Sequence, residues 1–258
     1  MAKPTENAIE VSHLTMGYDG RTIMRDISFD VRKGEAFLVI GPSGCGKSTL
    51  LRHLVGLAEP VEGRIRLLGE EFLDMDFASR QRFMRRIGIL YQAGALWSSM
   101  TIAENIALPL QLHTTLSDAE IRDVCICKLE LVGLAGFQDF YPSQLSGGMQ
   151  KRAGLARALA LDPEILFFDE PSAGLDPVTA RNLDRLIVEL RDTLGSTLVI
   201  VTHDLDSIFA VGTEAIYLDP KTCSILGQGA PRELLENPPA PEIADFLART
   251  PRRENQEK

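Results

Sequence analysis

Residues 41–48 constrain the fold of this chain more than any other segment. They read Gly-Pro-Ser-Gly-Cys-Gly-Lys-Ser and match the phosphate-loop pattern G-x-x-x-x-G-K-[ST]. Glycines in this pattern let backbone N–H groups turn toward phosphate oxygens, and the helix that follows directs its positive end to the same point. An apolar run precedes the motif, and Leu50, Leu54 and Leu57 recur at helical spacing after it. The segment predicts strand, loop and helix around a bound nucleoside triphosphate.

Six β-rich runs and the helical patterns between them predict the fold class. The runs span residues 27–31, 36–40, 87–91, 165–169, 197–201 and 215–218. Several are continuously apolar, which is typical of parallel strands covered on both faces. The stretch from about 103 to 161 lacks strong strand signals, and Ser117-Asp118-Ala119-Glu120 resembles a capping box that opens a helix. We predict an α/β core with a largely parallel sheet and an inserted helical lobe.

Composition limits the function classes. The 258 residues suffice for one sizeable core, and the net charge of −9 argues against a protein that coats nucleic acid, which needs a basic face. The first residues lack the apolar core of a signal peptide, and no apolar run approaches the roughly 20 residues that span a bilayer. We therefore expect any membrane work to pass through a partner.

The four cysteines are scattered and favour neither a zinc site nor a disulfide framework. We expect reduced thiols, with Cys125 and Cys127 on different faces of one helix. Cys45 lies inside the phosphate loop, where we expect it to contribute its backbone N–H.

A second glycine-rich segment and an acidic strand end carry the remaining chemistry. Residues 145–150, Leu-Ser-Gly-Gly-Met-Gln, precede a helical run and present a second set of helix-terminal N–H groups, although a simple helix cap would look the same. The run 165–169 ends in Asp169, followed by Glu170. A strand-end aspartate would lie beside phosphate-bound Mg²⁺, and the next glutamate could polarise the attacking water. The alternative for this pair is a solvated loop start.

In this order the two elements resemble the signature of ATP-binding-cassette (ABC) ATPases, over roughly residues 8–230. The resemblance implies a P-loop NTPase fold with a RecA-like, mostly parallel sheet core, an antiparallel β subdomain and an inserted helical subdomain. It places an ATPase domain at 8–242, with the core at about 8–92 and 162–235 and the helical subdomain at about 93–161. A C-terminal helix and charged tail would occupy 243–258.

The resemblance also assigns roles to individual residues. Gln92 is similar to the family's Q-loop glutamine, residues 172–176 to its D-loop, and His203 to its switch histidine. Tyr18 would stack on adenine, with a packed loop tyrosine as the alternative. The implied catalytic residues are Glu170, His203, Gln92 and Lys47. The implied Mg²⁺ ligands are Ser48, Gln92 and Asp169. The implied ATP-binding residues are Tyr18, Gly41, Pro42, Ser43, Gly44, Cys45, Gly46, Lys47, Ser48, Thr49, Ser146, Gly147, Gly148 and Asp176.

In the family, the signature segment of one copy closes the ATP site of a second copy in a head-to-tail dimer. The same arrangement is implied here, with Ser146, Gly147 and Gly148 acting on the partner's ATP.

The region after Gln92 bears on the partner and the cargo. It contains the pattern Q-x-G-A-L-[FW], followed by A-x-P-L and His113-Thr114, and is similar to ATPases of MCE-linked (Mla-type) lipid transporters. The resemblance implies transmembrane permease subunits, an MCE-type substrate-binding protein and a place on the cytoplasmic face of the inner membrane. Some members of this group also carry a small STAS-domain regulator. Trp97, with Leu96 and Met100, could receive a partner helix or pack inside the helical lobe.

Two alternatives remain from the sequence. One is a soluble ABC ATPase, such as the iron–sulfur assembly type. The other is the ATPase of a transporter for a different solute.

Overall fold

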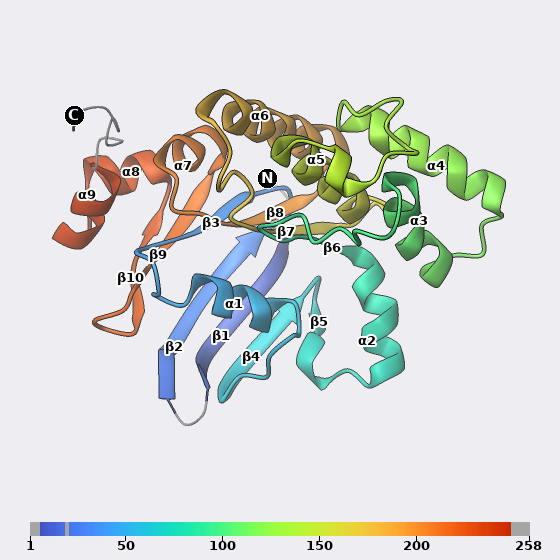
Figure 1. Ribbon diagram of the computed structural model, residues 1–258. Coiled ribbons are helices and arrows are strands. Elements are labelled where there is room, and N and C mark those ends of the chain that lie inside the picture. Colours follow the sequence, from blue (N-terminus) through green and yellow to red (C-terminus); the bar gives the residue numbers. More distant parts are fainter. Residues whose placement is uncertain (1–5, 19–20, 249–258) are drawn as a thin grey trace, which may run out of the picture.

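A six-stranded sheet organises the part of the chain that the computed structural model describes, residues 6–18 and 21–248 (Figure 1). Its strands lie in the order β10-β9-β3-β8-β7-β6. They span Ser224–Gly229, Glu214–Asp219, Ala36–Ile40, Thr197–Val201, Ile165–Asp169 and Ile87–Leu90, in that order. All pairings from β9 to β6 are parallel, and only β10 runs antiparallel to its neighbour. The predicted, largely parallel sheet is confirmed.

The two faces of this sheet bury separate sets of side chains. Successive residues of a strand point to opposite faces, so in β3 Leu38 and Ile40 join one hydrophobic cluster and Phe37 and Val39 the other. Helix α1 (Lys47–Leu54) packs on the Phe37 face, whereas α5 (Gly147–Ala158) and α6 (Pro177–Leu194) pack on the Leu38 face. Every residue of β3 and β8 is buried, as the continuous apolar runs predict.

A second, four-stranded antiparallel sheet covers α1 from the other side, in the order β2-β1-β4-β5 (Figure 1). Its strands span Arg21–Arg32, Asn7–Tyr18, Glu62–Leu67 and Glu70–Glu71. Buried residues of this sheet belong to the same cluster as Leu50 and Leu54 of α1. Helix α2 (Phe77–Phe83) follows it and leads into β6. This sheet is the expected antiparallel β subdomain.

The middle of the chain is helical, as predicted. It contains α3 (Ile102–His113), α4 (Asp118–Leu131), a 3₁₀ turn (Pro142–Gln144) and α5. The predicted capping box opens α4, where Ser117 N donates to Glu120 Oε2 at 2.7 Å and Glu120 N donates to Ser117 Oγ. Cys125 is buried and Cys127 exposed, so the two cysteines of α4 do point to different faces.

The C-terminal part adds α7 (Leu205–Val211), α8 (Pro231–Glu236) and α9 (Pro241–Leu247). The helix expected from 243 begins at Pro241, because proline is favoured in the first helical turn. The charged tail from 249 lies outside the described residues. Among the residues that are described, no helix combines the length and apolar character needed to cross a bilayer.

Candidate active site

The phosphate loop joins the end of β3 to the start of α1. Its last glycine, Gly46, lies just before the helix at φ 100°, and a Cβ there would lie 2.7 Å from Ile23 Cγ2. No side chain caps α1, and its first turn contains no acidic residue. The positive end of α1 is thus open to an anion, as the motif predicts.

Lys47 points back into the loop that precedes it. Its ammonium donates hydrogen bonds to the carbonyl oxygens of Gly41 (2.9 Å) and Pro42 (3.0 Å), and the residue is 7% exposed. Cys45 beside it is 1% exposed, and burial raises the pKa of its thiol although the Lys47 charge acts in the opposite direction. A protonated, buried thiol agrees with a backbone contribution from Cys45.

Ser48 and Asp169 meet where the start of α1 faces the end of β7. Ser48 Oγ donates to Asp169 Oδ1 at 3.0 Å. Mg²⁺ prefers oxygen ligands and keeps several of its waters, so it is commonly held by one or two protein oxygens together with phosphate. The oxygen atoms of Ser48 and Asp169, beside a phosphate-binding helix terminus, fit this ion as ligands.

Glu170 and His203 come from neighbouring parallel strands. Asp169 and Val201 are paired in β7 and β8, so the residues after them emerge at the same edge. His203 Nδ1 lies 2.7 Å from Glu170 Oε1. The Glu170 side chain is 13% exposed and that of His203 55%. The structure therefore brings together two predicted catalytic residues that are far apart in the sequence.

Gln92 lies beyond β6, the next strand of the same edge. Leu90 is paired with Phe168, so Gln92 leaves the sheet beside the Asp169-Glu170 end of β7 and is exposed. Thr49 is half-buried in the first turn of α1. The side chain of Tyr18 lies outside the described part of the structure, so its stacking role stays a prediction.

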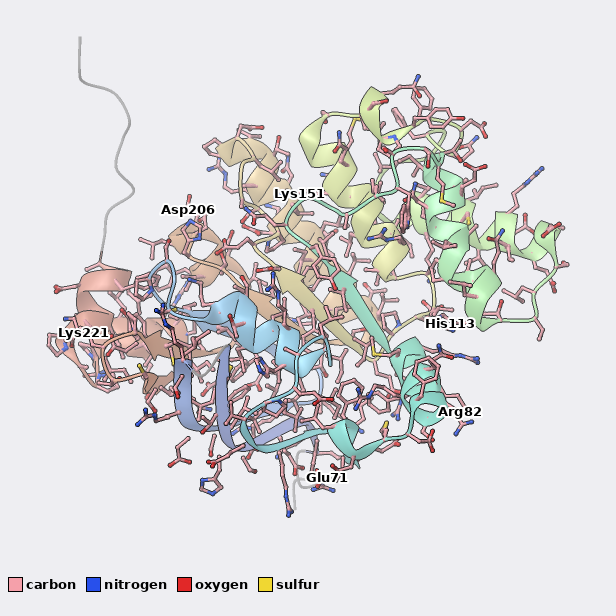
Figure 2. All side chains as sticks on the ribbon, turned by 60° about the horizontal axis from the view of Figure 1, so that its bottom comes forward. Glu71, Arg82, His113, Lys151, Asp206 and Lys221 are labelled. Carbon is pink, nitrogen blue, oxygen red and sulfur yellow. The ribbon has the colours of Figure 1, made fainter. Side chains whose placement is uncertain are left out.

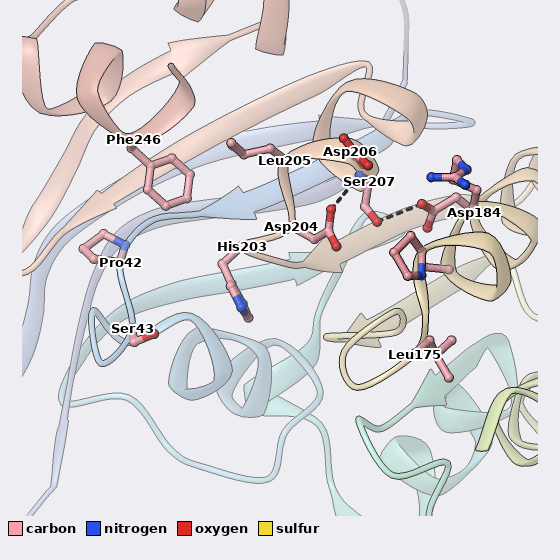
Figure 3. Close-up of a pocket in the computed structure, with 13 residues that line it drawn as sticks. Pro42, Ser43, Leu175, Asp184, His203, Asp204, Leu205, Asp206, Ser207 and Phe246 are labelled. Atoms are coloured by element: carbon pink, nitrogen blue, oxygen red, sulfur yellow. Dashed lines mark hydrogen bonds between the residues drawn. The ribbon is translucent and has the colours of Figure 1, made fainter. Parts of the chain in front are cut away.

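A cavity of about 980 Å³ adjoins the phosphate loop (Figure 3). Its lining includes Pro177. Pro42 and Ser43 lie on one side, Leu175 on another, and His203 points into the space between Ser43 and Leu175. This arrangement places the phosphate loop, the segment predicted to be the D-loop and the predicted switch histidine around one opening.

The signature segment lies elsewhere in the same chain. Ser146 caps α5 by accepting a hydrogen bond from Met149 N at 3.3 Å. Residues 146–148 do not line the cavity, and α5 and α1 lie on opposite faces of the main sheet. A Cβ on Gly148 would lie 2.5 Å from Thr179 Cγ2, whereas one on Gly147 would meet only Leu175 Cδ2 at 3.9 Å. Packing within the chain explains Gly148 but not Gly147.

Asp176 caps α6, because its Oδ1 accepts from Val178 N and Thr179 N, each at 3.1 Å. These hydrogen bonds, first of all those with Thr179, lower the pKa of the Asp176 carboxyl. A helix cap is sufficient reason for an aspartate here, so its D-loop role stays a prediction.

Comparison with known proteins agrees with this geometry. Residues 24–173 match the family model described as ABC transporter. The chain belongs to the ABC transporter family. It is 38% identical over 247 residues to the intermembrane phospholipid transport system ATP-binding protein MlaF of Escherichia coli, across 96% of this chain and 91% of that protein. It is 40% identical to the probable ribonucleotide transport ATP-binding protein mkl of Mycobacterium leprae, across 95% of this chain and 70% of that one.

Two solved ABC structures share the fold. CbiO1 of Clostridium perfringens, part of the cbiONQ transporter complex, has a TM-score of 0.82 at 28% identity and covers 96% of this chain and 97% of its own. A dimeric cassette in a post-hydrolysis state with ADP and phosphate has a TM-score of 0.78 at 30% identity, across 86% and 98%. This ABC protein is an ATPase with a P-loop NTPase fold.

Three polar side chains hold loops of this ABC ATPase, and the sequence pattern did not predict their roles. Asn105 of α3 is fully buried and bonds the backbone of Trp97 in both directions, at N (2.7 Å) and O (3.1 Å). Arg157 of α5 donates to the carbonyls of Gly94 and Ala95, and Lys151 donates to the turn after Glu170. The sequence contains one indication of the role of Asn105, because this polar residue interrupts the apolar face of a helix. It contains no such indication for Lys151 or Arg157.

Proposed function

We propose that this protein is the ATP-hydrolysing subunit of an ABC transporter that moves lipid, most simply phospholipid, between envelope membranes through a separate permease. The observation that carries the cargo assignment is the alignment with MlaF over nearly the whole of both chains. The Q-x-G-A-L-W segment after Gln92 supports the same subfamily.

ATP hydrolysis would divide among the residues at the sheet edge. Lys47 would exchange its loop carbonyls for the β- and γ-phosphates, because the ammonium is attracted more strongly to phosphate anions than to neutral carbonyl oxygens. Ser48 and Asp169, joined by Gln92, would hold Mg²⁺, which when bound neutralises phosphate charge as a Lewis acid. Glu170 would take the proton of the attacking water, and His203 would orient the Glu170 carboxylate and contact the γ-phosphate.

Two copies would form the working unit. The uncapped start of α1 and the start of α5 are both suited to an anion, but they lie on opposite faces of one chain's sheet. The room around Gly147 is explained if the ATP bound by the other copy occupies it. The dimeric state of a solved relative supports this arrangement. Each ATP would then lie between Lys47 of one copy and Ser146 of the other.

The segment around Trp97 is the proposed docking site for the permease. Trp97 is 59% exposed, which disfavours the alternative that it packs inside the helical lobe. Asn105 holds its backbone in place, so a bulky apolar side chain is presented on a fixed loop. Helix α3, which begins just after this loop, ends at a hollow of about 440 Å³ lined by Arg85 and residues 112–116; His113 marks this place in Figure 2.

The proposed assembly contains two ATPases, two permease subunits and an MCE-type substrate-binding protein, with a small STAS-domain regulator as a further candidate. The ATPases would lie on the cytoplasmic face of the inner membrane, attached through the permease. A net charge of −9 agrees with an assembly that does not include nucleic acid.

Purification from native membranes, with mass spectrometry of the subunits and the bound small molecules, tests the proposal. Co-purification with a permease, an MCE protein and phospholipid is the expected result. A permease that carries ribonucleotides or another solute would keep the transporter and overturn the lipid cargo. Co-purification with a soluble iron–sulfur scaffold instead of a membrane protein would overturn the transporter role itself.

A further inference from the structure

Lys151 is a buried cation that the proposed hydrolysis steps do not use. Lys151, which is labelled in Figure 2, lies in α5 and is 6% exposed. Its Nζ donates hydrogen bonds to the carbonyl oxygens of Pro171 (2.6 Å) and Ala173 (2.5 Å). Both acceptors belong to residues 170–173, here called the catalytic turn because Glu170 opens it.

The catalytic turn needs such support. Glu170 adopts φ 51°, a left-handed conformation that residues other than glycine rarely keep unless their surroundings impose it. Within the turn, Ala173 N donates to the Glu170 carbonyl at 3.2 Å, and Glu170 N donates to Val201 O at 2.9 Å. The two hydrogen bonds from Lys151 hold the residues that directly follow this strained position, and they come from a separate element, α5.

Electrostatics connects Lys151 to the catalytic carboxylate as well as to the turn. Burial lowers the pKa of the Lys151 ammonium, and the negative charge of Glu170 acts in the opposite direction. A displacement of Lys151 would therefore alter both the backbone and the field around Glu170.

The helix that carries Lys151 is itself fixed against the segment beyond the turn. Gly148, one helical turn before Lys151, packs against Thr179 so closely that a Cβ would lie 2.5 Å from its Cγ2. This close packing holds the start of α5 at the place from which Lys151 bonds the catalytic turn.

We propose that Lys151 is a positioning residue for ATP hydrolysis, which holds the catalytic turn on α5 so that the Glu170 carboxylate faces the attacking water. The proposal rests on the proposed role of Glu170 as general base. Lys151 donates to backbone carbonyls of its own chain and does not line the cavity at the phosphate loop, so its loss is expected to act on turnover and to leave nucleotide binding intact.

A double-mutant cycle on the full-length protein tests the proposal. Lys151→Met removes the donors and keeps the length of the side chain. We expect it to lower kcat by about tenfold or more, since small misplacements of a catalytic group have effects of this size, and to change ATP affinity by less than about twofold. In a Glu170→Gln background the same change is expected to lower residual turnover by less than about twofold, because the base is already absent.

Lys128→Met is the matched control. Lys128 is also a buried lysine, but it pairs with Asp162 away from the site, so its loss is expected to affect stability and not kcat. Lys151→Gln, which keeps two N–H donors on a shorter side chain, is expected to be intermediate, and it serves in the same cycle if the Met variant does not fold.

Three results would overturn the positioning role. They are unchanged turnover in Lys151→Met, a loss of ATP affinity, or a decrease in turnover by the same factor with and without Glu170. The third would make Lys151 a support of the fold or the dimer. If Glu170→Gln alone turns over at the normal rate, the proposed role of Glu170 fails first, and the role of Lys151 fails with it.

Discussion

Glu170 is the proposed general base, and a substitution that replaces one oxygen of its carboxylate by nitrogen tests this role directly. Its carboxylate is held by His203 at 2.7 Å, and its backbone by Val201 and the catalytic turn. An amide in its place keeps the size of the side chain and removes its ability to accept a proton.

Glu170→Gln is expected to lower ATP turnover by about 10²- to 10⁴-fold, the usual contribution of a general base, while ATP still binds. The variant should accumulate as an ATP-bound dimer, which gel filtration with and without ATP would reveal. Glu130→Gln, on the exposed side of α4, is the control and should behave as the unmodified protein. Normal turnover in Glu170→Gln would remove Glu170 from the mechanism.

Asp184 of α6 is a second informative residue, because it is a carboxyl group in the core. It is 3% exposed, and its Oδ2 accepts from Ser207 Oγ at 2.8 Å. Burial raises its pKa to about 6; the Ser207 hydrogen bond lowers it, and the charges of Asp204 and Asp206 raise it further. The folded protein therefore keeps a proton here at pH values where the unfolded chain has released it.

The sign of the pH effect follows from the raised pKa. The stability associated with the bound proton is present below about pH 4 and is lost as pH rises through about 6. Asp184→Asn has no proton to lose. Its free energy of unfolding, relative to the unmodified protein, is expected to increase by up to about 3 kcal/mol between pH 4 and pH 7. Urea unfolding at both pH values measures this, with Asp123→Asn on the exposed side of α4 as control. If the difference in the free energy of unfolding between Asp184→Asn and the unmodified protein is the same at both pH values, the raised pKa of Asp184 is contradicted.

At the scale of elements, α5 connects three functional loops. Its first turn carries the signature segment, Lys151 bonds the catalytic turn, and Arg157 bonds the carbonyls of Ala95 (2.7 Å) and Gly94 (3.0 Å) after Gln92. The two glycines that open α5 differ in their surroundings, because Gly148 packs closely against Thr179 whereas Gly147 has room for a Cβ. Substitutions at the two positions can therefore separate packing within the chain from closure of the site by a second copy.

Gly147→Asp is expected to leave the melting temperature unchanged or slightly higher, since a carboxylate is favourable in the first turn of a helix. It should abolish ATP-induced dimerisation, because its charge would face the phosphates bound by the other copy. Gly148→Ala is the contrasting variant: the close Thr179 makes it expected to lower the free energy of unfolding, by about 1 kcal/mol or more. Normal dimerisation of Gly147→Asp would contradict closure of the site in trans.

At the scale of the whole molecule, the residues proposed for catalysis and the residue proposed for docking lie on different parts of the fold. The catalytic groups gather at one edge of the main sheet, and Trp97 lies on the loop between β6 and α3. A change in the docking loop should therefore spare the chemistry.

Trp97→Ala is expected to weaken attachment to the permease by about 30-fold, the effect of losing an aromatic anchor worth about 2 kcal/mol. ATP affinity of the isolated chain should stay within about twofold. The amount retained by partner-containing membranes measures attachment. Leu235→Ala on α8, at the other end of the molecule in Figure 1, is the control. Full retention of Trp97→Ala would place the docking surface elsewhere.

The predictions from sequence succeeded where a function needs particular residue types at short spacing. The phosphate loop, the capping box before α4 and the strand that ends in Asp169 are such cases, and each lies where it was expected. The separate antiparallel sheet followed from the family resemblance, since its strands β1, β4 and β5 gave no strong run of their own. Element bounds were less accurate, as at α9.

The local pattern of this chain determined the kind of chemistry, because helix termini, glycine turns and strand ends act through neighbours a few residues away. Tertiary structure alone decided which distant groups meet: Glu170 with His203, Ser48 with Asp169, and Lys151 with the turn after Glu170. The physical reason is that parallel strands bring their carboxyl ends to one edge whatever their separation in the chain. The role of a buried cation such as Lys151 depends on the carbonyl oxygens that packing places around it, and these belong to residues distant in the sequence.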